Sequence, residues 1–279
     1  MRSMCLVMSV VAGLFFCPSA KADTLTMVAD EWCPYNCKPN TQYPGFLVEV
    51  AQCALQPFGH RINYRIQPWQ RAIASVHQNN AEGLLGVGQY EARPILLPKT
   101  PLLHAIHQTY TTTDSNWRYQ RPESLANMRL GIIAGYSYGN FLADVVDNER
   151  VRTLSVTRVY GQQPLLQLLN LLAADRIDVF VEEQRVLNYQ MQQWRGHEIS
   201  LRAAGTVDRE PIYIGFSPTN PNAKRYIQQL EKGIQRLKAD GTYTSLQSKY
   251  GMLKGVSTIH ADAPLLCQAD GRSTANTVL

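Results

Sequence analysis

Residues suited to binding a small charged molecule stand at the end of an expected strand and at the start of an expected helix. Arg93 follows a buried strand expected at 83–87, and its planar guanidinium can hold a carboxylate through two hydrogen bonds. Ser137 stands where a helix is expected to begin, and free amide groups at a helix N-terminus attract an anion. Together they predict a site for a small acid; a surface arginine and an ordinary helix cap are the alternatives.

Aromatic side chains are expected near the same place. Trp32 follows the first expected strand, and Trp69 opens the second expected helix. Tyr136 and Tyr138 flank Ser137. Ligands of open α/β sheets bind beyond the carboxyl ends of the strands, so these side chains can converge with the arginine on one cleft. Aromatic faces stack on planar groups and attract cations, whereas core packing is the alternative for both tryptophans.

Two series of alternating strands and helices position these residues. In the first series, strands are expected at 24–29, 62–66 and 83–87, and helices at 46–58 and 69–77. In the second, strands are expected at 129–134, 154–160 and 177–181, and helices from the 135–139 turn to about 146, at 164–174 and at 184–194. Two such series predict two α/β lobes, each with a mainly parallel sheet flanked by helices.

Two extended stretches, 104–113 and 211–217, alternate polar and apolar residues and are expected to cross between the lobes. Closing helices are expected at 221–239 and 242–250. His104 and His107 have the spacing of a pair of ligands on a helix, but they fall in the first extended stretch and are expected to lie at the surface.

The first 22 residues have the organisation of a secretory signal peptide. Arg2 supplies a positive charge, residues 5–17 are apolar, and residues 20–22 (Ala-Lys-Ala) form a small-x-small cleavage site. The mature chain is therefore expected to begin at Asp23 and to be released into a periplasm. A membrane anchor is the weaker alternative, because the apolar run is shorter than the roughly 20 residues of a span.

The composition argues against several other functions. The 279 residues carry a formal net charge of +5 from scattered basic residues, so no nucleic-acid partner is expected. The sequence has no Gly-x-Ser-x-Gly, no His-Glu-x-x-His and no phosphate-loop motif. No catalytic residue, metal or cofactor is therefore expected.

Four cysteines follow the signal segment: Cys33, Cys37, Cys53 and Cys267. An even number of cysteines in an oxidising compartment favours disulfides, and four allow three pairings. A Cys33–Cys37 bridge is favoured because the turn-rich loop between these residues can bring its ends together; a metal site is the alternative. Cys53 either pairs with Cys267 or is a buried helix residue.

Three motifs give the chain a family resemblance: Trp-Cys-Pro-Tyr at 32–35, Gly-Phe at 45–46 and Tyr-Glu-Ala-Arg at 90–93. In order and spacing they resemble Tyr-x-Pro-Phe, Gly-Phe and Thr-x-x-Arg of the family 3 periplasmic solute-binding proteins, receptors for polar amino acids and related small acids. The resemblance covers residues from about 24 to about 250, nearly a whole two-lobe unit. It implies the two-lobe periplasmic binding protein fold, with two crossing hinge strands.

The expected organisation is a signal peptide at 1–22, lobe one at 23–110 and 212–256, lobe two at 111–211, and a C-terminal tail at 257–279. The resemblance implies that a monomer closes on a ligand carrying a carboxylate, by a hinge motion, and passes it to an ABC permease or to a membrane sensor. The alternative is an enzyme on the same fold, because cyclohexadienyl dehydratases have the same shape.

The resemblance also assigns roles to residues. Arg93 would hold the α-carboxylate of the ligand with help from Ser137, while Trp32 and Trp69 would line or cover the ligand. Glu183, five positions after an aspartate, would pair with the amino group. Its neighbour Glu182 is a rival, because alternation along a strand sends only one of the two inward.

One departure from the family pattern bears on the ligand. Tyr90 stands in the place of the usual threonine, and Gly86 and Gly88 precede it. This change favours a bulkier or more aromatic solute.

Overall fold

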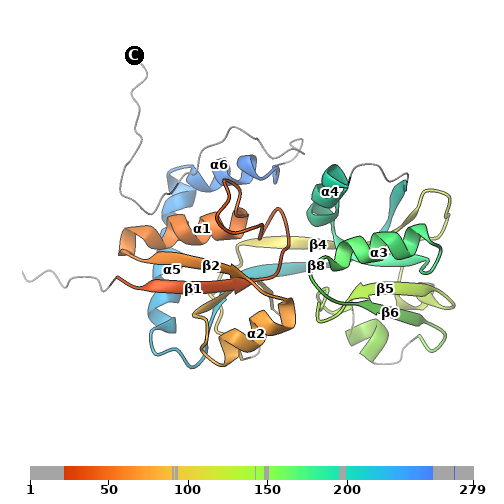
Figure 1. Ribbon diagram of the computed structural model, residues 1–279, viewed down its shortest axis with the longest axis horizontal. Coiled ribbons are helices and arrows are strands. Elements are labelled where there is room, and N and C mark those ends of the chain that lie inside the picture. The colour runs from red at the N-terminus through yellow and green to blue at the C-terminus, as the bar shows by residue number, and fades with distance from the viewer. Residues whose placement is uncertain are drawn as a thin grey trace, which may run out of the picture.

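Two groups of strands and helices, joined by two long strands, make up the fold (Figure 1). The computed structural model describes residues 22–89, 91, 94–141, 143–147, 151–194, 199–253 and 267. The predictions for Tyr90 and Arg93 fall outside these residues.

The strands are β1 (Thr24–Ala29), β2 (Arg61–Ile66), β3 (Gly83–Gly88), β4 (Leu103–Thr112), β5 (Arg129–Ile133), β6 (Ser155–Val159), β7 (Val179–Glu183) and β8 (Leu201–Phe216). The α-helices are α1 (Phe46–Leu55), α2 (Trp69–His77), α3 (Pro164–Ala173), α4 (Gln184–Gln193), α5 (Ala223–Ala239) and α6 (Thr242–Lys249). Short helical turns are η1 (Gln56–Phe58), η2 (Pro122–Leu125) and η3 (Ala143–Asp147).

All eight strands belong to one sheet in the order β2-β1-β3-β8-β4-β7-β5-β6. On either side of the centre the pairing is parallel: β1 pairs with β2 and β3, and β5 pairs with β6 and β7. The central strands β4 and β8 are antiparallel to each other and to their outer neighbours. The predicted α/β fold with two crossing strands is confirmed.

The β1 side of the molecule has a core built around α1, which lies against α5 and α6. Nine residues of α1 are buried, because apolar side chains face both the sheet and the neighbouring helices. A Cβ atom at Gly233 of α5 would lie 2.1 Å from the carbonyl oxygen of Ala54. Only glycine allows the two helices to approach this closely.

Two disulfides are present. Cys33 is bonded to Cys37, as predicted, and this bond closes the loop after β1. Cys53 is bonded to Cys267, which ties α1 to the C-terminal segment and decides the alternative that the sequence left open. A cross-link of this kind restricts the unfolded chain.

Two local predictions were wrong. The helix expected up to residue 146 is instead a series of turns followed by the π-helical turn η3. The amide groups of Gly139 and Asn140, which a helix would present at its start, donate to Glu210 and Asp208. His107 was expected at the surface but is buried, because β4 lies in the middle of the sheet between β7 and β8.

Candidate functional site

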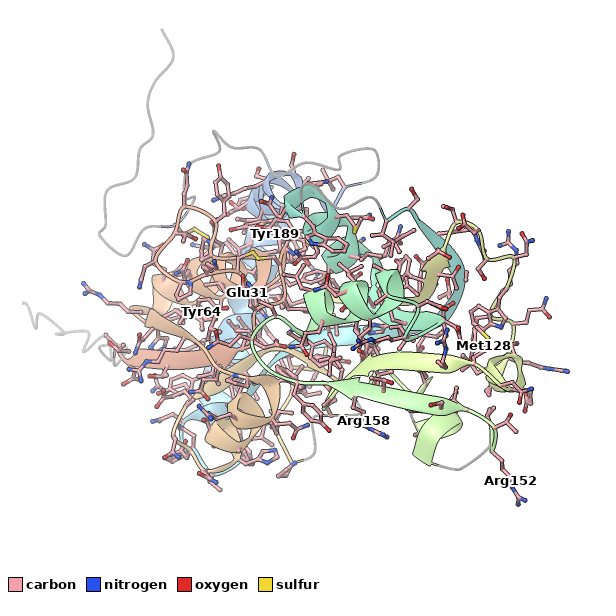
Figure 2. The ribbon with its side chains drawn as sticks, turned by 45° about the vertical axis from the view of Figure 1, so that its right-hand side comes forward. Glu31, Tyr64, Met128, Arg152, Arg158 and Tyr189 are labelled. Carbon is pink, nitrogen blue, oxygen red and sulfur yellow. A yellow bond between two sulfur atoms is a disulfide. The ribbon has the colours of Figure 1, made fainter. Side chains whose placement is uncertain are left out.

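Two neighbouring cavities lie between the two groups of elements. The larger, here called the broad cleft, has a volume of about 420 Å³. Its walls come from the loop 31–43 on one side and from the start of α3, the end of β7 and α4 on the other. Figure 2 shows Glu31 and Tyr189 of this cleft near the middle of the molecule, whereas Met128 and Arg152 lie at one end.

The smaller cavity, here called the deep cavity, has a volume of about 30 Å³. Besides Trp32 and Tyr136, the polar or aromatic side chains that border it are Asp30, Trp69, Glu91, His107, Ser137, Tyr138 and Glu210. Trp32 and Tyr136 line both cavities and so form the boundary between them.

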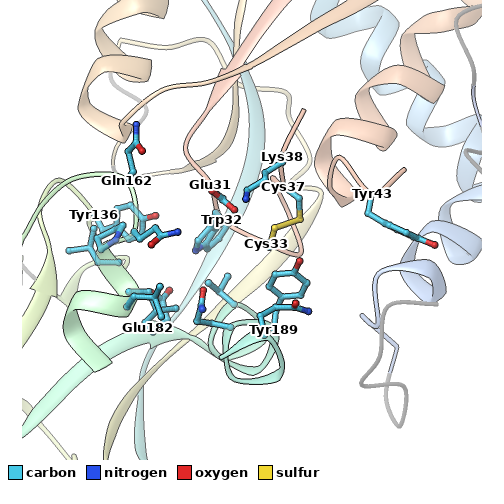
Figure 3. A pocket seen from close by; sticks show the side chains of 18 of the residues that line it. Glu31, Trp32, Cys33, Cys37, Lys38, Tyr43, Tyr136, Gln162, Glu182 and Tyr189 are labelled. Carbon is cyan, nitrogen blue, oxygen red and sulfur yellow. A yellow bond between two sulfur atoms is a disulfide. The ribbon is translucent and has the colours of Figure 1, made fainter. Parts of the chain in front are cut away.

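The loop after β1 positions Trp32 through several local contacts. The Trp32 amide donates to the Asn36 carbonyl at 2.7 Å, and the disulfide closes the same turn. The indole packs on Tyr35 with 4.5 Å between ring centroids. Trp32 and the disulfide therefore form a fixed wall, opposite Glu182 and Tyr189 (Figure 3).

Glu182 and Glu183 end strand β7 and have different roles. Both are buried, but Glu182 lines the broad cleft. One Glu183 oxygen accepts hydrogen bonds from the amides of Arg185 at 2.6 Å and Val186 at 3.0 Å, so Glu183 caps α4. Strand alternation separates the two side chains, and it is Glu182 that faces the cleft.

The Glu182 carboxylate has an unusual environment. Its Oε1 accepts a hydrogen bond from the Glu183 amide at 2.7 Å. Within the described residues its Oε2 has no close hydrogen-bond partner, although the Trp32 side chain is near enough to act as a donor and to lower the pKa of Glu182. Burial raises the pKa of Glu182 to about 7, although the Glu183 amide and the nearby His107 act in the opposite direction.

In the deep cavity, carboxylates of the protein accept hydrogen bonds from the turn around Ser137, whereas Trp69 Nε1 and His107 Nδ1 have no partner within the described residues. The Ser137 amide donates to Glu91 at 2.8 Å, and the Ser137 hydroxyl donates to Glu210 at 3.2 Å. The Gly139 amide donates to the other Glu210 oxygen at 3.1 Å, and His107 Nε2 lies 3.1 Å from that same oxygen. The donors that sequence analysis assigned to a ligand carboxylate therefore contact carboxylates of the protein.

Burial changes the acid–base properties of this cavity. Desolvation raises the pKa of Glu91 to about 7, and the charge of Glu210 adds to the shift. Desolvation also raises the pKa of Asp30 to about 6, against the hydrogen bond that it accepts from Tyr136. Burial alone would lower the pKa of His107, but the hydrogen bond and charge of Glu210 outweigh burial and raise it.

Sequence reasoning predicted part of this arrangement. Four predicted residues that are distant in sequence lie around the two cavities: Trp32, Trp69, Tyr136 and Ser137. The disulfide cysteines Cys33 and Cys37 line the broad cleft. Glu183 lies behind Glu182, at the start of α4.

Sequence reasoning missed Asp30, Glu91, His107, Glu210 and Tyr189. Asp30 directly follows β1, so its place beyond a strand end was a usable signal. The place of Glu210 inside the long strand β8 gave no such signal.

Solved structures with the same architecture are two-lobe binding proteins. An ancestral arginine-binding protein bound to arginine matches with a TM-score of 0.68, 15% identity, and coverage of 81% of this chain and 97% of that chain. A histidine kinase sensor domain with similarity to periplasmic binding proteins matches with a TM-score of 0.67 and 19% identity, covering 84% and 96%. At these identities the likeness shows the fold alone.

A third structure is an ancestral amino acid-binding protein that is a precursor of cyclohexadienyl dehydratase. It matches with a TM-score of 0.63 and 15% identity, covering 81% of this chain and 94% of that chain. The same fold is therefore found in a binding protein that is the precursor of an enzyme. No curated protein matches this chain.

The sequence model of the bacterial extracellular solute-binding proteins, family 3, matches residues 25–253. The chain belongs to this family, whose members act outside the cytoplasm. Across the described part of the chain, no helix has both the length and the apolar character needed to cross a membrane.

Proposed function

We propose that this protein captures a small polar solute, an amino acid or a derivative of one, and delivers it to a membrane transporter or sensor. One observation carries the proposal: the broad cleft, of about 420 Å³, is lined by both groups of elements, which β4 and β8 connect. A site shared in this way allows a ligand to hold two lobes together.

The proposed lobes are 23–110 with 212–256, and 111–211. Ligand binding would shift an equilibrium between open and closed forms, because only the closed form offers contacts from both sides. Arg93 is the proposed partner of a ligand carboxylate. Cleavage after residue 22 would release the protein into the periplasm, where a permease or a sensor can recognise the closed form.

Small-angle scattering tests the mechanism. Protein purified without refolding is first analysed by native mass spectrometry, which should identify a retained solute. Addition of that solute to stripped protein should reduce the radius of gyration and shift the tryptophan emission. A confirmed solute that binds without either change would contradict hinge closure.

The same preparation separates a receptor from an enzyme. A receptor releases the solute chemically unchanged, and that is the expected result. Conversion of prephenate, or of the retained solute, into a product would instead support the dehydratase alternative.

A further inference from the structure

We propose that the solute is an amino acid derivative whose side chain carries a neutral polyhydroxy group, such as a sugar ring, and that four glutamines of the broad cleft bind this group. These glutamines, here called the amide row, are Gln162, Gln163, Gln190 and Gln193. Tyr189 is the aromatic wall on which the ring packs. The inference rests on the proposed function and adds the chemical class of the solute's side chain.

The amide row comes from two elements on one side of the cleft. Its first two members directly precede α3, whereas Gln190 and Gln193 belong to α4. Residues three positions apart lie on the same face of a helix, so both reach the cleft. In Figure 3, Trp32 lies between Gln162 and Tyr189. The row therefore extends along the cleft past the indole and suits a solute that is longer than an amino acid.

The side-chain amides of the row are available to a ligand. Within the described residues, none of them forms a hydrogen bond with the protein. Gln190 is half-buried and the other three are exposed. Each amide carries two N–H donors and one carbonyl acceptor. Hydroxyl groups also donate and accept, so a polyhydroxy group can replace the water on these amides and keep their hydrogen bonds.

Tyr189 fits the same ligand class. It is half-buried, lines the cleft and directly precedes Gln190 on α4. No aromatic ring of the described residues packs on it. One face of a sugar ring presents C–H groups and packs on an aromatic face, while the hydroxyls at its edge point outward. A ring packed on Tyr189 would therefore direct its hydroxyls toward the amides of the row.

The charges of the cleft favour a neutral side chain on the solute. The charged residues among the described lining are Glu31, Lys38 and Glu182. Glu31 and Lys38 are exposed and have opposite signs, so water screens them and their fields partly cancel. Glu182 is buried and its negative charge disfavours a second acidic group. The amides of the row carry no charge and favour neither sign.

An apolar side chain is the competing interpretation. The cleft also contains apolar residues, such as Leu166 and Val186, and its volume of about 420 Å³ lies in the range of about 300–1,000 Å³ that suits drug-sized ligands. A purely apolar group would pack on these residues. It would also remove water from the amide row without replacing the hydrogen bonds, which lowers the affinity.

Isothermal titration calorimetry with three compounds that share one amino acid part tests the inference. Asparagine has no extension. In glucosyl-asparagine a glucose ring is joined to the side-chain nitrogen, and in cyclohexyl-asparagine a ring of the same size without hydroxyls takes its place. The glucosyl compound should bind at least about tenfold more tightly than either of the others, because it alone contacts the amide row and the aromatic wall.

A double variant, Gln163→Met with Gln190→Met, tests the amides themselves. Methionine keeps the length of the side chain but has no strong donor or acceptor. The affinity for glucosyl-asparagine should fall about tenfold, because at least two hydrogen bonds are lost, while the affinity for asparagine should not change. The matched control is Gln235→Met, the same change at an exposed position of α5, which should leave both affinities unchanged.

Each outcome bears on the inference. If asparagine or cyclohexyl-asparagine binds at least as tightly as the glucosyl compound, the inference is overturned while the proposed function stands. An unmodified amino acid as the solute retained in native mass spectrometry would have the same meaning. Equal affinity of the double variant and the natural protein for glucosyl-asparagine would remove the amide row as the binding group. If none of the three compounds binds, the inference fails, and failure of a full set of amino acids as well would count against the proposed function.

Discussion

The broad cleft and the deep cavity share Trp32 and Tyr136 but differ in how many hydrogen bonds their carboxylates accept from the protein. In the deep cavity, Glu91 and Glu210 accept the hydrogen bonds of the turn around Ser137. In the broad cleft, Glu182 accepts one short hydrogen bond, from the Glu183 amide, and the Trp32 side chain is a further donor close to it. The hydrogen bonds to Glu91 and Glu210 therefore join the turn around Ser137 to β8 and to the segment after β3.

The pH dependence of stability tests the deep cavity and has the largest expected effect. The pKa of Glu91 rises from 4.5 to about 7 on folding, so the folded state favours its protonated form. The stability that this proton provides is present below pH 4.5 and is lost as the pH rises through about 7. The expected loss for this carboxyl is about 3 kcal/mol, at about 1.4 kcal/mol for each pKa unit.

Other buried groups of the deep cavity and of the broad cleft act in the same direction. Asp30 and Glu182 have raised pKa values of about 6 and about 7, and the raised pKa of His107 also favours the protonated folded state. Folding lowers the pKa of other carboxyls, such as Asp178, from the ordinary value of 3.8. These groups change the stability only at pH values below 3.8. Chemical denaturation should therefore show stability falling from about pH 5 to about pH 8.

Glu91→Gln should make this pH profile flatter, whereas the exposed variant Glu123→Gln should not change it. A profile that rises toward about pH 8 would instead show that the buried carboxylates are stabilised in their charged form, and that the deep cavity does not favour protonated carboxyls.

Arg93→Ala is the next largest test and asks whether a carboxylate of the solute is bound as well. If an amino acid is the retained solute, the variant should bind it about a hundredfold less tightly, because a bidentate charged contact is lost. The exposed Arg71→Ala is the control and should have no effect. Equal affinity of Arg93→Ala and the natural protein would leave recognition to the broad cleft alone.

Removal of the Cys33–Cys37 bond tests whether the solute needs Trp32 to be held in place on the wall of the broad cleft. The two cysteines are separated by 4 positions, so a double serine variant should lose about 2 kcal/mol of stability. Its affinity for the solute should fall several-fold, because the same turn positions Trp32. A double serine variant at Cys53 and Cys267 should be less stable but should keep the affinity, since neither residue lines the cleft.

Tyr189→Ala tests the aromatic wall and has the smallest expected effect. Loss of one aromatic contact of about 1 kcal/mol should weaken binding of the retained solute roughly fivefold. Tyr189→Phe keeps the ring and should bind normally. Weakening by Tyr189→Phe to the same extent would show that the hydroxyl, rather than the ring face, contacts the ligand.

Apart from the helix expected up to residue 146, the sequence by itself determined the order of strands and helices, because the apolar spacing of each segment reflects which face is buried. It also determined the two crossing strands and the Cys33–Cys37 bond, whose partners are close along the chain. The roles of Arg93 and Tyr90 stay predictions.

The tertiary structure alone decided which side chains meet across long distances in sequence. It chose Glu182 over Glu183, because the start of α4 uses the second carboxylate as its cap. It paired Cys53 with Cys267, and it placed Glu91 and Glu210 on the amides around Ser137. The spacing of apolar residues along one segment shows which of its faces is buried. The partner of a buried charge depends instead on how segments that are distant in sequence pack together.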